Sequence, residues 1–146
     1  MKKTVIANKG NASTGKSETI KQVAKLILAA YPAAKLIPAT IDFSKDIKLI
    51  CNIGDTKIGI ESQGDPNSRL PKSLKDFVDA DCALIICATR TSGETVKAVS
   101  ELNTLHGYDV IWMTNYRSWQ KGNKDLNDLS AEHVFELIQR ILAGKI

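Results

Sequence analysis

Eight consecutive residues near the N-terminus, residues 10–17 (GNASTGKS), combine the residue types that hold a chain of phosphates. Gly10 and Gly15 permit backbone angles that turn successive N–H groups inward around phosphate oxygens. Lys16 is predicted to bridge the outer phosphates and act in catalysis, and the Ser17 hydroxyl is predicted to bind Mg²⁺. The other predicted contacts of the polyphosphate are Asn11, Ala12, Ser13, Thr14 and Thr19.

The sequence on either side of this segment has the pattern of a strand followed by a helix. Residues 4–8 are apolar and β-branched, as in a strand. From Ile20 onward, apolar residues recur at i, i+3, i+4 and i+7, which predicts one face of a helix that Pro32 must end. In this context the G-x-x-x-x-G-K-[ST] pattern resembles the P-loop nucleoside triphosphate-binding superfamily. The resemblance implies that superfamily's fold and a magnesium-bound nucleoside triphosphate, without singling out a branch.

A phosphate site of this kind requires a carboxylate at the end of a nearby strand, to hold the magnesium shell or to orient water. Glu61 ends the run 57–60 and begins a polar turn, so we predict it as a metal ligand and catalytic residue. Asp42 follows the predicted strand 35–40, a place from which an acid activates the acceptor hydroxyl in many P-loop kinases, and is the second catalytic candidate. Asp65 has the sequence context of an ordinary turn and is a third carboxylate for the same role.

Phosphoryl transfer also requires a second cation near the equatorial oxygens. Arg90 comes two residues after the apolar run 83–88, whose carboxyl end should face a ligand crevice, and we predict it as catalytic. Arg117 lies similarly after the last predicted strand and is predicted to contact the nucleotide, while Arg69 is a further candidate. Gln63 has a place loosely similar to that of a glutamine that orients water in several GTPases.

The polar segment after the last predicted strand bears on the choice of base. The guanine-specific pattern Asn-Lys-x-Asp is absent there, because Tyr116 and Ser118 stand where Lys and Asp would be. ATP is therefore the predicted ligand in preference to GTP. Trp119 in this segment is predicted to be exposed, where it stacks on a base, meets a partner or anchors its own loop. Trp112 lies within the strand and is predicted to belong to the core.

Length and the order of elements predict one α/β domain over residues 1–146. Alternating apolar residues on both sides of Gly54 predict a hairpin, and the unbroken apolar run 83–88 predicts a strand that is buried on both faces. Further strands are predicted at 35–40 and 110–113, and further helices at 70–78, 96–105 and 134–142. We therefore predict the three-layer α-β-α fold of P-loop proteins, with a mostly parallel sheet and an antiparallel hairpin at its edge.

Composition limits the classes of function. No run of about 18 apolar residues occurs, so no membrane span is expected. Cys51, Cys82 and Cys87 form no C-x-x-C pair, which is typical of reduced thiols and favours a cytoplasmic protein. The net charge is +4, but the Lys and Arg residues are scattered and only 5% of residues are aromatic. Nucleic acid is therefore not the expected partner.

The predicted function is magnesium-dependent binding of a nucleoside triphosphate, with hydrolysis or phosphoryl transfer. The alternative is a nucleotide-responsive binding module with little turnover of its own, laid out like a GTPase. In that case the loop 61–70 would become ordered around the γ-phosphate and recruit another protein. The sequence identifies neither the phosphoryl acceptor nor a protein partner.

Overall fold

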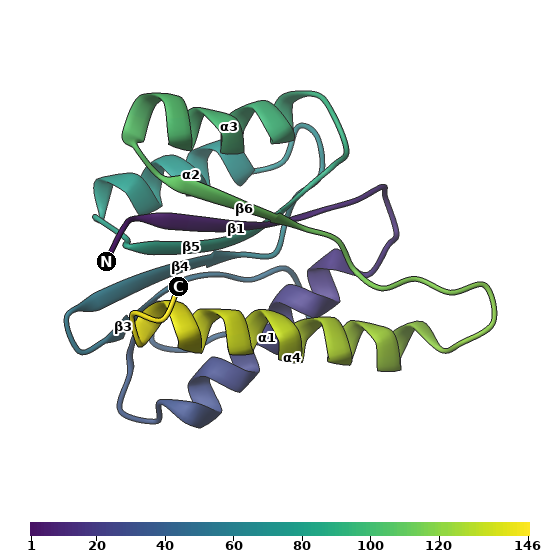
Figure 1. The fold of residues 1–146 in the computed structure, drawn as a ribbon, viewed down its shortest axis with the longest axis horizontal. Helices are drawn as coiled ribbons and strands as arrows, with labels where there is room; N and C mark the ends of the chain where they lie inside the picture. The colour runs from purple at the N-terminus through teal and green to yellow at the C-terminus, as the bar shows by residue number, and fades with distance from the viewer.

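The sheet has six strands in the order β2-β3-β4-β5-β1-β6, and the computed structural model describes residues 1–146 (Figure 1). The strands are β1 (Thr4–Lys9), β2 (Lys35–Ile37), β3 (Lys48–Ile53), β4 (Thr56–Glu61), β5 (Leu84–Thr89) and β6 (Asp109–Met113). β4, β5, β1 and β6 are parallel to one another, whereas β3 is antiparallel to both of its neighbours. The predicted α/β architecture with a mostly parallel sheet is confirmed.

Helices cover both faces of the sheet, which gives the molecule three layers (Figure 1). The helices are α1 (Lys16–Ala30), α2 (Leu70–Asp79), α3 (Glu94–His106) and α4 (Asn123–Leu142). Ile86 of β5 belongs to the apolar cluster under α1 and α4, and Ile85 to the cluster under α2 and α3, because successive side chains of a strand point to opposite faces. β5 is buried along its whole length, which explains its unbroken apolar sequence. None of the helices has both the length and the apolar character needed to cross a bilayer.

The predicted hairpin is present as β3 and β4, joined by a tight turn in which Gly54 has a φ of 59°. Its predicted place at the edge of the sheet is wrong, because β2 pairs with the outer side of β3. β2 thus covers backbone groups that β3 would otherwise leave unpaired. It extends only to residue 37, since Pro38 has no N–H to donate to a ladder.

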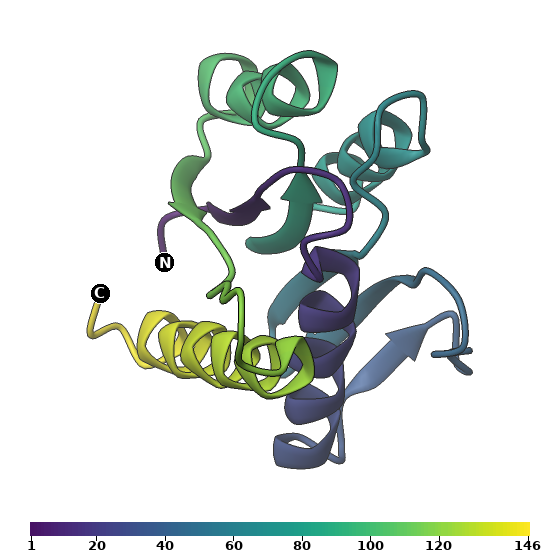
Figure 2. The same ribbon diagram turned by 90° about the vertical axis from the view of Figure 1, so that its right-hand side faces the viewer.

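The carboxyl ends of β4, β5, β1 and β6 lie at the same end of the sheet, along the strand direction (Figure 2). The chain leaves β1 toward α1 on one face and leaves the adjacent β5 toward α3 on the other, an arrangement that opens a crevice between the two strands. β3 is antiparallel, so its amino end reaches the same end of the sheet. The loops 10–15, 62–69, 90–93 and 114–122 and the segment before β3 therefore gather there.

Trp112 is exposed, so its predicted place in the core is wrong. It lies in β6, the outermost strand at its end of the sheet, and is 39% exposed. The Lys9 ammonium lies 5.0 Å from the centroid of its indole ring, a cation–π distance. An edge strand has a neighbouring strand on one side only. The Trp112 ring is therefore covered in part by the long side chain of Lys9 and stays in part open to solvent.

Gly59 of β4 lies where α2 packs against the sheet. A Cβ atom at this position would come within 2.5 Å of Phe77 Cγ in α2, and Phe77 is fully buried. The missing side chain therefore lets α2 lie close to β4.

We expect Gly59→Ala to lower the free energy of unfolding by about 1–3 kcal/mol, because the Phe77 ring would have to move within a packed core. Urea denaturation followed by circular dichroism measures this change. Gly122→Ala is the matched control, since a Cβ at Gly122 meets nothing closer than 3.8 Å. That substitution should cost about 0.5 kcal/mol or less. Equal losses in the two variants would contradict the close contact.

Candidate functional site

The loop between β1 and α1 contains two residues in the left-handed region, Ser13 with φ 59° and Gly15 with φ 78°. Left-handed backbone favours glycine, because a Cβ atom is strained there. At Gly15 a Cβ would also collide with the side-chain amide of Asn127 in α4. Glycine at this position thus serves both the turn of the loop and the close approach of α4.

The Lys16 side chain folds back into this loop. Its Nζ donates hydrogen bonds of 2.7 Å to the carbonyl oxygens of Gly10 and of Asn11, and the residue is 7% exposed. Burial lowers the pKa of Lys16, the Arg90 guanidinium lowers it further, and the Asp65 carboxylate opposes both. The direct partners of the ammonium are neutral carbonyls, so its charge remains available to an anion.

Ser17, at the start of α1, lies against a carboxylate that the sequence analysis did not select. The hydroxyls of Ser17 and Ser62 donate hydrogen bonds of 2.7 and 2.8 Å to the same oxygen, Asp46 Oδ1. Burial would raise the pKa of Asp46, but these hydrogen bonds and the charge of Lys21 lower it below its usual value. A hydroxyl beside an ionised carboxylate is a donor set that suits Mg²⁺. Since no group of three or more His, Cys, Asp or Glu residues is present, water and ligand oxygens would complete such a site.

The sequence does not point to Asp46 directly, because Asp46 precedes a strand whereas the predicted carboxylates follow one. It lies just before β3, whose amino end adjoins the carboxyl end of β4, where Lys48 is paired with Glu61. The predicted hairpin could have indicated Asp46. In a hairpin, a residue just before the first strand lies beside a residue just after the second.

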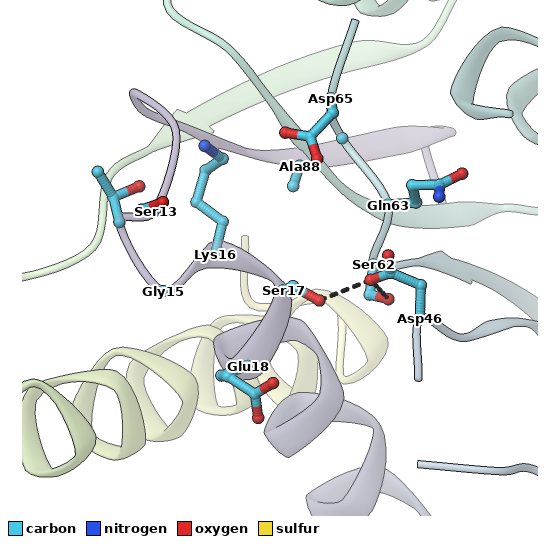
Figure 3. A pocket seen from close by; sticks show the side chains of 12 residues that line it. Ser13, Gly15, Lys16, Ser17, Glu18, Asp46, Ser62, Gln63, Asp65 and Ala88 are labelled. Atoms are coloured by element: carbon cyan, nitrogen blue, oxygen red, sulfur yellow. Dashed lines mark hydrogen bonds between the residues drawn. The ribbon is translucent and has the colours of Figure 1, made fainter. Parts of the chain in front are cut away.

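These groups line one cavity of about 250 Å³ at the carboxyl end of the sheet (Figure 3). The lining residues are Ser13, Thr14, Gly15, Lys16, Ser17, Glu18, Asp46, Ser62, Gln63, Gly64, Asp65 and Ala88. The cavity thus brings together residues 13–17 of the predicted loop and three carboxylates, Glu18, Asp46 and Asp65, of which the sequence predicted Asp65 alone. Its lining is mostly polar, as a site for a charged ligand requires.

Glu61 does not line the cavity, although it was predicted as a metal ligand and catalytic residue. It lies on the α2 side of β4 and is fully buried. Its carboxylate accepts hydrogen bonds from Arg69 Nε at 2.9 Å, Arg69 Nη2 at 3.1 Å, Ser73 Oγ at 2.6 Å and the backbone N–H of Gln63 at 2.9 Å. The structure therefore gives Glu61 and Arg69 the role of fastening the loop 62–69 to α2.

The cavity lining also leaves out the predicted residues Gly10, Asn11, Ala12, Arg90 and Arg117, and it leaves out Asp42 and Thr19. Asp42 is exposed and accepts hydrogen bonds from the amide and hydroxyl of Ser44, so it stabilises a local turn. Thr19 is buried within α1, and its hydroxyl has no hydrogen-bond partner. The structure brings neither Asp42 nor Thr19 to Lys16.

Asp65 lines the cavity and is paired with Arg90, which lies just outside the lining. Arg90 Nη2 and Nε lie 3.0 and 3.2 Å from Asp65 Oδ1. Gly64 packs so closely on the Ala88 carbonyl that a Cβ atom would collide with it. The turn predicted around Asp65 thus carries a carboxylate that faces the ligand space.

Arg117, predicted to contact the nucleotide, contacts the loop between β1 and α1 and does not line the cavity. Its Nη1 donates a hydrogen bond of 3.2 Å to the carbonyl of Ser13. The nearby Asn115 Nδ2 donates to the carbonyl of Thr14 at 3.0 Å. The segment after β6 therefore holds the outer turn of the loop in place, a contribution of Asn115 that the sequence did not reveal.

We expect Arg69→Ala to lower the free energy of unfolding by about 3 kcal/mol, because it leaves the Glu61 carboxyl group buried without a cation. Arg140→Ala is the control, since Arg140 pairs with Glu136 between exposed side chains. Its loss should cost less than about 1 kcal/mol. Urea denaturation of both variants gives the comparison, and similar values would show that Glu61 does not depend on Arg69.

The chain matches no known protein-family model, and neither a curated protein nor a solved structure is significantly similar to it. No relative therefore indicates what the cavity binds. Its ligand has to be inferred from the contacts and charges of the residues described above.

Proposed function

We propose that the protein is a P-loop nucleoside triphosphatase, which binds magnesium-bound ATP in the cavity beside Lys16 and hydrolyses it or transfers its γ-phosphoryl group. One observation carries the proposal: Lys16, Ser17 and Asp46 line the same cavity, at the start of the helix that follows the glycine loop. These residues offer a polyphosphate a buried cation and offer Mg²⁺ a pair of oxygen ligands.

The amino end of α1 supports the binding of an anion. Its N-cap is Gly15, which has no side chain to accept a hydrogen bond from the first amides of the helix. Those N–H groups are therefore open to a ligand, and the helix dipole adds partial positive charge. Together with Lys16 they form a site for two or more phosphate groups.

Ser17 and Asp46 are the residues that would hold Mg²⁺. The Ser17 hydroxyl and the ionised Asp46 carboxylate are hard oxygen donors that already lie 2.7 Å apart. When bound, the ion supplies positive charge to the phosphate oxygens. Glu61 is replaced by Asp46 in this role, because Arg69 and Ser73 occupy its carboxylate.

Hydrolysis is the reaction that the cavity favours. Gln63 and Asp65 line it. Gln63 Oε1 accepts from the Arg69 backbone N–H and Asp65 Oδ1 from Arg90, so the Gln63 side-chain NH2 and Asp65 Oδ2 are the groups left to orient a water molecule. Arg90 lies beside Asp65 and provides the second cation that the sequence predicted. The alternative, a nucleotide-responsive module, has support in the same contact, because Asp65 belongs to the loop 62–69 and its exposed ion pair with Arg90 is easily exchanged for a phosphate.

We expect Lys16→Ala and Asp46→Asn to weaken the binding of magnesium-bound ATP by about 10- to 100-fold, as each removes a charge-assisted contact. Asp46→Asn should also abolish the gain in affinity that Mg²⁺ gives. Isothermal titration with and without Mg²⁺ measures both effects, and a phosphate-release assay measures turnover. Asp55→Asn, in the exposed β3–β4 turn, is the matched carboxylate control. Unchanged affinity in both site variants would refute the proposal, whereas binding without turnover would favour the module.

The pKa of Lys16 predicts how affinity depends on pH. A bound polyphosphate favours the charged ammonium, so affinity is highest while Lys16 is protonated in the free protein. Because burial lowers the pKa of Lys16, affinity should begin to fall at a lower pH than the ordinary lysine value of 10.5 would dictate. Titrations with inorganic triphosphate from neutral to alkaline pH test this. The alkaline decline should disappear in Lys16→Ala, and its persistence there would assign it to another group.

A further inference from the structure

Trp119 is fully exposed, with a relative accessibility of 104%, in the loop between β6 and α4. Figure 1 shows this segment, residues 114–122, projecting beyond the helices and strands. Trp119 lines an open cavity of about 210 Å³ together with Arg117 and Ser118. A single exposed aromatic residue is common on protein surfaces, so the position of this loop decides whether Trp119 meets a ligand.

The loop 114–122 is joined directly to the glycine loop. Arg117 donates a hydrogen bond to the carbonyl of Ser13, and Asn115 donates one to the carbonyl of Thr14. Ser13 and Thr14 both line the proposed phosphate cavity. Trp119 therefore follows, by two residues in the sequence, the Arg117 side chain that contacts Ser13 in the lining of that cavity.

The charges in the cavity set the direction in which a nucleotide would lie. Ser17 and Asp46 provide the proposed magnesium site, which belongs beside the outer phosphates. Figure 3 shows Ser13 and Asp46 on opposite sides of Lys16. With the outer phosphates toward Asp46, the nucleoside leaves the cavity past Ser13, on the side of Arg117 and Trp119.

The polar groups nearest this exit are already occupied. Both amide hydrogens of Asn115 have acceptors, the carbonyl of Thr14 at 3.0 Å and Asn127 Oδ1 at 3.3 Å, and its Oδ1 accepts from Asn8 at 2.7 Å. The Tyr116 hydroxyl lies 3.0 Å from His133 in α4. Asn115 thus has no hydrogen left with which to read the edge of a base. Of the two exposed aromatic residues in this loop, Tyr116 is 47% exposed and is engaged with His133, whereas Trp119 is fully exposed.

We propose that Trp119 binds the base of the nucleotide by stacking, and that the site selects purines over pyrimidines by the area of the stacked ring and not by hydrogen bonds to the base edge. This inference rests on the proposed function. It assigns to Trp119 the contact that makes a nucleoside triphosphate bind more tightly than inorganic triphosphate. Stacking discriminates little between adenine and guanine, so this contact adds no preference between ATP and GTP, whereas CTP and UTP should bind more weakly than ATP.

The test compares magnesium-bound ATP with magnesium-bound inorganic triphosphate by isothermal titration. Trp119→Ala should weaken ATP binding about tenfold and leave triphosphate binding unchanged, because only ATP carries a base. Trp119→Phe, which keeps an aromatic face, should stay within about threefold of the wild type. Trp112→Phe, at the other exposed tryptophan, is the matched control and should change neither ligand.

The control variant also gives a direct signal. The chain has 2 tryptophans, so Trp112→Phe leaves Trp119 as the sole indole fluorophore. ATP should quench its emission, and inorganic triphosphate should not. The inference is overturned if Trp119→Ala binds ATP as the wild type does, or if it loses affinity for triphosphate equally. Wild-type protein that binds triphosphate and ATP with the same affinity would remove the stacking role but keep the proposed function. Binding of neither ligand would remove both.

Discussion

The ammonium group of Lys16 is the charge around which the carboxyl end of the sheet is organised. Removing a lysine from water is costly unless polar groups surround it, and here two carbonyls of its own loop do so. The loop can offer those carbonyls only because Gly15 adopts a left-handed conformation and turns the chain into α1. From outside, Arg117 and Asn115 hold the carbonyls of the loop's outer turn. The site is thus built to keep a cation buried before any ligand arrives.

The second buried charge, Glu61, follows from the alternation of side chains along β4. Ile58 and Ile60 face the cluster under α1, so Glu61 and Gly59 must face α2. On that side Arg69 and Ser73 supply donors, and the carboxylate is satisfied there and not in the cavity. The glycine at position 59 lets α2 come close enough for this contact. A buried ion pair and a close helix–sheet contact therefore depend on the same strand.

Local patterns in the sequence were enough to predict the order of the elements and the loop from Gly10 to Ser17. Apolar periodicity identifies helices and strands because it depends on near neighbours in the chain. The remaining errors concern contacts between distant residues. Asp46 reaches Ser17 only through the antiparallel course of β3, and Glu61 turns away because of its register on β4. Trp112 became exposed because β6 is an edge strand, and strand order cannot be read from composition.

The loop 62–69 is held unequally at its two ends, and this bears on how the cavity responds to a charged ligand. At its far end Arg69 binds the fully buried Glu61, where losing one partner costs several kcal/mol, of the order of 3–5. At its near end Arg90 binds the exposed side chain of Asp65, an interaction of about 1 kcal/mol or less. An anion beside Lys16 competes for Arg90 at little cost, whereas Arg69 lies outside the cavity and is paired with Glu61. The Asp65 side chain is therefore the part of the loop most easily released, because Gly64 stays packed on the Ala88 carbonyl and the Gln63 backbone N–H stays bound to Glu61.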